Sequence, residues 1–132
     1  MSVPARIIHY RVVAGARNIA FVGSRSWSDK ERIREVMLSL PGPFTVVTGG
    51  ARGADTLAKE VAEELGFGVI EVLPNWHEWG KRAGPMRNRV IAEMANAMCA
   101  FWDGHSRGTK NAMEEMRRLD KDVFVFLAGD SA

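Results

Sequence analysis

Three segments combine glycine with polar or cationic side chains at the point where an apolar run ends. The segments are Gly23 to Trp27, Gly49 to Gly53 and Asp103 to Thr109. The second and third lead directly into helical patterns, where backbone N–H groups and the positive helix end favour an anion such as phosphate. Arg52 adds a cation to the second segment, and Ser106, Gly108 and Thr109 add donors to the third. A purely structural alternative is that these glycines only permit tight turns.

A fourth segment, residues 74–89, places aromatic and cationic side chains together. It contains Trp76, Trp79, Lys81, Arg82, Arg87 and Arg89. Aromatic faces can stack on a base while cations contact phosphates. We expect Arg87 and Asn88 in the first turn of a helix, where the helix dipole disfavours a cation, so Arg87 is predicted to serve ligand binding rather than folding. The alternative is a solvated basic loop whose tryptophans pack on the core as a lid.

Several common catalytic motifs are absent from the sequence. The loop after Gly49 lacks the lysine of a Walker motif, and Gly23 stands alone where a dinucleotide fingerprint needs three glycines. Lys81 occupies the position where a zinc protease beginning at His77 needs its second histidine. There is no Gly-x-Ser-x-Gly elbow of a serine hydrolase. No cofactor and no metal site are therefore expected.

Apolar runs that alternate with helical patterns indicate how these segments are positioned. The runs 19–23, 44–48, 68–73, 97–102 and 123–127 are typical of buried strands, with a loop over 74–84 and a helix beginning at Pro85. Ser28 and Glu31 have the spacing of a capping box. The pattern predicts a Rossmann-like three-layer α/β/α domain with a mainly parallel five-stranded sheet. Ligands of such sheets bind beyond the carboxyl ends of the strands.

Length and composition are those of one globular domain. The chain has 132 residues, 46% of them hydrophobic and 26% charged, with a net charge of +2, which excludes a disordered tail, a collagen-like fibre and a coiled coil. The single cysteine, Cys99, excludes an internal disulfide. Neither a signal peptide nor a membrane-spanning stretch is evident, so we expect a cytoplasmic protein without a membrane partner.

The domain is expected to span residues 18–132. Residues 1–17 alternate only loosely between apolar and polar and form an N-terminal arm. The arm is an extra edge strand, a dimer arm or a disordered tail. Seven methionines and four tryptophans exceed what a small core needs, which predicts a homodimer.

The motifs together resemble a known family. Thr48 to Asp55, Trp76, Gly80 to Asn88, and Ser106 to Thr109 occur in the order found in the YspA/YpsA-related branch of the SLOG superfamily. The resemblance extends from about Ile19 to Leu127. That superfamily includes the LOG phosphoribohydrolases and the DNA-processing protein DprA. The resemblance implies a Rossmann-like fold and a nucleotide-derived ligand, without implying a particular reaction for this branch.

Comparison with the LOG enzymes separates binding from catalysis. Gly108-Thr109 and the pair Met86 and Arg89 match LOG elements, but Ala112 stands where the catalytic glutamate would fall. Asp103 is the replacement carboxylate if the chain is catalytic. The loops and the resemblance together assign ligand contacts to Gly23, Ser24, Arg25, Gly49, Gly50, Ala51, Arg52, Gly53, Asp55, Trp76, Lys81, Arg87, Asn88, Arg89, Gly104, Ser106, Arg107, Gly108 and Thr109.

These assignments lead to one functional hypothesis and two alternatives. The chain is expected to bind a nucleotide derivative, such as ADP-ribose or a nucleoside phosphate, and to sense or sequester it. The first alternative is a LOG-like phosphoribohydrolase or other N-glycosidase that uses Asp103. The second is a DprA-like protein that binds single-stranded DNA, which the modest net charge disfavours.

Overall fold

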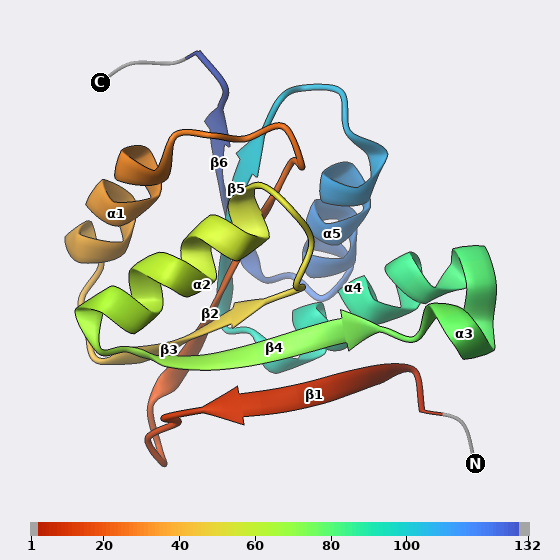
Figure 1. Cartoon of the computed structure of the whole chain (residues 1–132), viewed down its shortest axis with the longest axis horizontal. Helices are drawn as coiled ribbons and strands as arrows, with labels where there is room; N and C mark the ends of the chain where they lie inside the picture. Colours follow the sequence, from red (N-terminus) through yellow and green to blue (C-terminus); the bar gives the residue numbers. More distant parts are fainter. Residues whose placement is uncertain (1–2, 130–132) are drawn as a thin grey trace.

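Six strands form one sheet with helices on both faces in the computed structural model, which describes residues 3–129 (Figure 1). The strands are β1 (Ala5–Tyr10), β2 (Arg17–Gly23), β3 (Phe44–Thr48), β4 (Gly68–Pro74), β5 (Ala97–Trp102) and β6 (Asp122–Leu127). The helices are α1 (Lys30–Ser39), α2 (Ala54–Leu65), α3 (Trp76–Trp79), the short 3₁₀ helix η1 (Gly80–Arg82), α4 (Ala83–Met94) and α5 (Arg107–Arg118). The three-layer prediction is confirmed, with six strands in place of five. Residues 1–2 and 130–132, at the two ends of the expected arm and domain, lie outside this description.

The two cores follow from the alternation of side chains along the central strands. In β2, Ile19 and Phe21 belong to the cluster packed against α1 and α2, whereas Ala20 and Val22 belong to the cluster packed against α4 and α5. Phe21 is fully buried, and burial of such a side chain stabilises the fold by about 1.5–3 kcal/mol. Strands that are apolar on both faces explain why the sequence shows unbroken hydrophobic runs.

The order of the strands creates a switch point at β2. The sheet runs β1-β4-β3-β2-β5-β6, and all neighbouring strands are parallel except β1 and β4. From β2 the chain moves outward to β3 and β4, and then returns to the other side of β2 to form β5 and β6. A crevice therefore opens beyond the carboxyl ends of β2 and β5, where open α/β sheets bind their ligands.

Residues 5–10 of the N-terminal arm form the edge strand β1. This strand is antiparallel to β4, with Ala5 opposite Pro74 and Arg6 opposite Leu73. The indole N–H of Trp79 donates to the backbone oxygen of Val3 at 2.9 Å, which holds the start of the arm against α3. The pairing places Arg6 beside the carboxyl end of β4.

The expected loop between β4 and the following helix is largely helical. The backbone N–H of Trp79 donates to the oxygen of Asn75 at 3.0 Å, closing the single turn of α3, and η1 follows directly. The next helix, α4, begins at Ala83 rather than at Pro85. Proline is tolerated in the first turn because its missing N–H would have no intrahelical acceptor there. Arg87 therefore lies in the second turn of α4, and its predicted place in the first turn was wrong.

The predicted capping box is also corrected. The side chain of Asp29, not that of Ser28, accepts the backbone N–H of Arg32 at 3.0 Å. α1 begins at Lys30, so Asp29 occupies the capping position and Ser28 precedes it. The spacing of Ser28 to Glu31 therefore pointed to a residue one position before the cap.

The methionines do not support the argument for a dimer. Met37, Met98, Met113 and Met116 are buried in the two cores. Exposed apolar side chains occur instead on β6, one edge of the sheet, where Phe124 is 48% exposed. The homodimer stays a prediction. No helix within residues 3–129 is long and apolar enough to cross a membrane.

A methyl group added at Gly23 should destabilise the fold at the switch point. A Cβ atom there would lie 2.2 Å from the backbone oxygen of Phe101 and 2.7 Å from Cβ of Ala54. Since neither atom belongs to a flexible side chain, we expect Gly23→Ala to lower the free energy of unfolding by about 1–3 kcal/mol or more. Gly108→Ala is the control, because its Cβ meets nothing within 4 Å. Urea unfolding that shows equal stability for Gly23→Ala and the parent would contradict this prediction.

Candidate functional site

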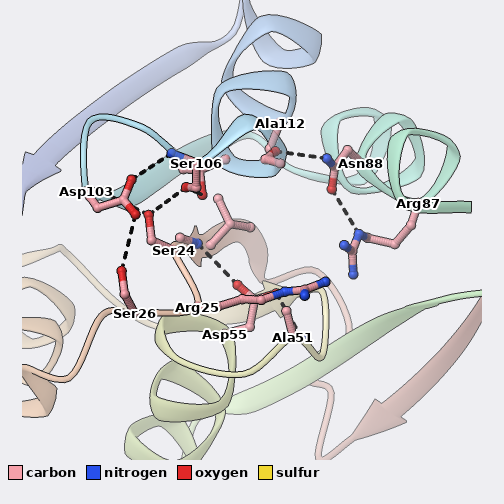
Figure 2. Close-up of a pocket in the computed structure, with 14 residues that line it drawn as sticks. Ser24, Arg25, Ser26, Ala51, Asp55, Arg87, Asn88, Asp103, Ser106 and Ala112 are labelled. Carbon is pink, nitrogen blue, oxygen red and sulfur yellow. Dashed lines mark hydrogen bonds between the residues drawn. The ribbon is translucent and has the colours of Figure 1, made fainter. Parts of the chain in front are cut away.

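A cavity of about 330 Å³ lies beyond the carboxyl ends of β2 and β5, at the switch point (Figure 2). We call it the switch-point cavity. Its walls come from the loop after β2, the start of α2, the middle of α4, and the loop and helix after β5. The lining residues are Val22, Gly23, Ser24, Arg25, Ser26, Ala51, Asp55, Arg87, Asn88, Asp103, Ser106, Gly108, Thr109 and Ala112. All three glycine-containing segments singled out in the sequence contribute to it.

The Asp55 carboxylate joins two of these segments. Asp55 lies in the first turn of α2 and is only 4% exposed. Its Oδ1 accepts the backbone N–H of Gly23 at 3.2 Å, and its Oδ2 accepts the backbone N–H of Ala51 at 3.2 Å. The end of β2 and the glycine loop after β3 are thereby tied to the N-terminus of α2, where the helix dipole favours a negative charge.

Burial and the neighbouring groups shift the pKa of Asp55 in opposite directions. Burial raises the pKa of Asp55 from 3.8 to about 6, although the charge of Arg87 and the N–H groups of Ala51, Gly23 and Gly49 lower it. Desolvation thus outweighs the favourable partners. The site holds a buried carboxyl whose charge changes just below neutral pH.

Arg87 has structural partners as well as a place on the cavity wall. Its Nη1 donates to the backbone oxygen of Gly49, and its Nε donates to Oδ1 of Asn88 at 2.9 Å. Burial lowers the pKa of Arg87, the Asp55 carboxylate raises it, and the charge of Arg25 lowers it. Figure 2 shows the Arg25 side chain extending toward Arg87. Arg87 therefore also holds the glycine loop, and its role in ligand binding stays a prediction.

A second carboxylate, that of Asp103, organises the loop after β5. Its Oδ1 accepts the backbone N–H groups of His105 at 2.8 Å and Ser106 at 2.7 Å, and its Oδ2 accepts the hydroxyl of Ser26 at 3.2 Å. The N–H donors of Ser106 and His105 lower the pKa of Asp103 to about 2. Asp103 is therefore ionised at neutral pH and a weak general base.

The hydroxyl of Ser24 bridges the loops after β2 and β5. Its Oγ accepts the backbone N–H of Asp103 at 2.9 Å and lies 2.8 Å from Oγ of Ser106. The Ser106 hydroxyl donates in turn to Oγ1 of Thr109 at 3.1 Å. These contacts align the first turn of α5 with the cavity, where the N–H groups of Gly108 and Thr109 have no intrahelical acceptor.

Asn88 and Ala112 form the remaining wall. The Asn88 amide donates to the backbone oxygen of Gly108 at 3.2 Å and to Oδ1 of Asn111 at 2.8 Å, so it joins α4 to α5. Ala112, which the sequence comparison aligned with the LOG glutamate, lines the cavity. A methyl group therefore stands where the resemblance would place a catalytic carboxylate.

A second cavity of about 460 Å³ adjoins the first, and we call it the arginine cavity. It lies beyond the carboxyl ends of β3 and β4 and shares Arg25, Ala51 and Arg87 with the switch-point cavity. Its other lining residues are Arg6, Gly49, Gly50, Arg52, Leu73, Pro74 and Trp76. The two cavities together contain most of the ligand residues predicted from sequence.

Five predicted ligand residues line neither cavity: Gly53, Lys81, Gly104, Arg107 and Arg89. Lys81 and Arg89 line a separate cavity on the outer side of α4, and Arg89 pairs with Glu115 at 3.5 Å. Two positions along a helix correspond to about 200°, which separates Arg89 from Arg87. Gly53 supports the site through close packing, because a Cβ there would lie 2.4 Å from the backbone oxygens of Ser24 and Arg25.

Sequence reasoning missed several lining residues. Val22 and Ser26 adjoin the assigned contacts Gly23 to Arg25, and Ser26 already lies within the segment Gly23 to Trp27. Leu73 and Pro74 end β4. Arg6 lies 67 positions before Leu73 in the chain, and only the antiparallel pairing of β1 with β4 brings the two together.

Comparison with known sequences identifies relatives of the chain. The sequence model of the YspA, cpYpsA-related SLOG family matches residues 17–79. The Gene 61 protein of Mycobacterium phage D29 is 33% identical over 120 residues. That alignment covers 83% of this chain and 96% of the phage protein.

Comparison with solved structures finds the same fold in two DNA processing proteins. DprA from Streptococcus pneumoniae superposes with a TM-score of 0.68 at 20% identity, covering 90% of this chain. The chain spans about half, 54%, of that protein's length. DNA processing protein A from Helicobacter pylori, described as having a unique single-stranded DNA binding mode, superposes with a TM-score of 0.60 at 18% identity. That match covers 87% of this chain and 68% of the other.

Removal of the Asp55 charge should change the pH dependence of stability. A carboxyl whose pKa is raised from 3.8 to about 6 on folding stabilises the fold below pH 4, and this contribution disappears as the pH rises to about 6. We therefore expect the stability of Asp55→Asn relative to the parent to rise by roughly 2 kcal/mol between pH 4 and pH 7.

Urea unfolding of both proteins at pH 4, 5, 6 and 7 measures this difference. Asparagine cannot accept one of the two backbone hydrogen bonds, and this loss lowers the free energy of unfolding by the same amount at each pH. It therefore does not change how the stability difference between the two proteins varies with pH. A stability difference that stays constant from pH 4 to pH 7 would show that Asp55 titrates normally.

Proposed function

The chain belongs to the YspA, cpYpsA-related SLOG family, and we propose that it is a nucleotide-binding protein. In this proposal the switch-point cavity holds the phosphate and sugar of a phosphorylated nucleoside. The observation that carries it is the convergence of Arg25 and Arg87 on a cavity that also receives the N-terminus of α5. Two cations beside unsatisfied backbone donors are the groups that bind a phosphate.

The balance of charge supports an anionic ligand. Arg25 is exposed and forms no ion pair with any of residues 3–129. It lies close enough to Arg87 to lower that residue's pKa, so the two positive charges repel each other. A phosphate placed between them would relieve the repulsion. Gly108 has no side chain and so leaves room for the phosphate, and the hydroxyl of Thr109 can contact the phosphate oxygens.

We propose binding rather than cleavage of the ligand. Asp55 and Asp103 are the two carboxylates that line the switch-point cavity among the described residues. Both oxygens of each accept hydrogen bonds from the loops that they hold. Ala112 adds no third carboxylate, so no lining carboxylate is free to activate a water molecule or to attack the sugar as a nucleophile.

Single-stranded DNA is the second candidate ligand. The H. pylori neighbour binds single-stranded DNA, and the arginine cavity would suit a phosphodiester backbone. Proteins that bind single strands typically stack bases on aromatic side chains and contact the backbone phosphates with cations, and the arginine cavity is lined by Trp76 and by arginines. A steep loss of affinity with salt would favour this candidate over a small nucleotide.

Removal of Arg25 should weaken nucleotide binding without weakening the fold. We expect nucleoside monophosphates or ADP-ribose to raise the melting temperature of the parent, and Arg25→Ala to reduce affinity about tenfold or more, because a charge-assisted contact is lost. Arg117→Ala is the matched control, since it removes one exposed arginine from the last turn of α5. Calorimetry measures the affinities. An absence of any thermal shift at millimolar ligand would contradict the proposed function.

The parent protein should leave bound nucleotides intact. Neither described carboxylate in the switch-point cavity is free to act at the glycosidic bond, so incubation with nucleoside 5′-monophosphates is expected to release no base. Chromatography of the mixture after several hours measures the free base. Base release by the parent that Asp103→Asn abolishes would establish the phosphoribohydrolase alternative instead.

A further inference from the structure

We propose that the arginine cavity holds a second nucleotide unit, joined through a phosphate to the unit in the switch-point cavity. The ligand would then be a dinucleotide or a longer strand rather than a mononucleotide. This inference rests on the proposed function and extends it to a cavity that the single-nucleotide proposal leaves empty. The volume of about 460 Å³ is within the usual range for small-molecule sites.

The two cavities share three lining residues. Arg25, Ala51 and Arg87 face both. A ligand that occupies both cavities must therefore pass beside Arg25 and Arg87. A phosphate that links two sugars would lie between these cations, with one nucleoside on each side.

The arginine cavity carries more positive charge than one phosphate requires. Arg6, Arg25, Arg52 and Arg87 line it, and none of the described carboxylates does. Neither Arg6 nor Arg52 forms an ion pair within residues 3–129, and both are exposed. The nearby Glu71 carboxylate pairs with Lys59 at 3.3 Å, behind Gly50. Four like charges at one cavity favour a ligand with more than one phosphate.

Trp76 supplies a surface on which a base can stack. Its side chain is 51% exposed and lines the cavity, while its inner edge lies against Gly84. The face of the Trp79 indole, by contrast, is covered by the Arg82 guanidinium, whose Cζ lies 5.3 Å from the ring centroid. An exposed aromatic face beside arginines is the arrangement that binds single-stranded nucleic acid.

The strand β1 gives the inference a test that is independent of the switch-point cavity. Arg6 reaches the arginine cavity only because β1 pairs with β4, and it does not line the switch-point cavity. Arg52 and Trp76 also line only the arginine cavity. Variants at these three positions should therefore affect the second nucleotide and leave the first unaffected.

The experiment compares the four nucleoside 5′-monophosphates with the four 5′-phosphorylated homodinucleotides by calorimetry. We expect the best dinucleotide to bind roughly five- to a hundredfold more tightly than its mononucleotide. Arg6→Ala, Arg52→Ala and Trp76→Ala should each remove much of this gain without changing mononucleotide affinity or the melting temperature. Trp76→Phe should retain most of it, and the control Arg117→Ala should change neither affinity.

Different results separate the inference from the proposed function. If mononucleotides bind but dinucleotides bind no more tightly, or the three variants leave dinucleotide affinity unchanged, the inference is overturned and the proposed function stands. If no mononucleotide or dinucleotide binds, both fail. Oligonucleotides of three to eight residues identify the source of the ligand. Affinity that stops rising at two residues indicates a dinucleotide, and affinity that continues to rise with a strong salt dependence indicates a single strand.

Discussion

The buried Asp55 carboxylate is the contact on which the arrangement of the site depends. It accepts N–H groups from the end of β2 and from the glycine loop after β3, while Arg87 holds the opposite side of that loop through Gly49. A desolvated charge is costly unless it is paired and hydrogen-bonded, so these partners cannot move independently. Three chain segments are thereby fixed around one cavity before any ligand binds.

The same principle shapes the second half of the site. Asp103 and Ser24 hold the loop after β5, as Asp55 holds the loop after β3. Both carboxylates are used to position backbone groups, which leaves arginines and helix N-termini as the groups that face a ligand. A fixed frame of donors around an open cavity suits recognition of phosphate, since little ordering accompanies binding.

Sequence alone predicted the sheet core and the loops of the switch-point cavity, because strands buried on both faces leave unbroken apolar runs and each loop begins where a run ends. It failed where contacts are long-range. Nothing in the spacing of Arg6 indicated its place beside Leu73. The helical pattern implies that Arg87 and Arg89, two positions apart, point in different directions, but it did not show which cavity each one lines.

The central claim is that a nucleotide phosphate binds among the loops fixed by Asp55 and Asp103. Two-dimensional ¹H–¹⁵N NMR during titration with the best-binding nucleoside monophosphate tests it most directly. We expect the largest amide shifts in residues 23–26, at Ala51 and in residues 106–109, with small shifts elsewhere. Shifts concentrated on the outer side of α4, at Met86, Arg89 and Val90, would place the ligand in a different cavity and contradict this site.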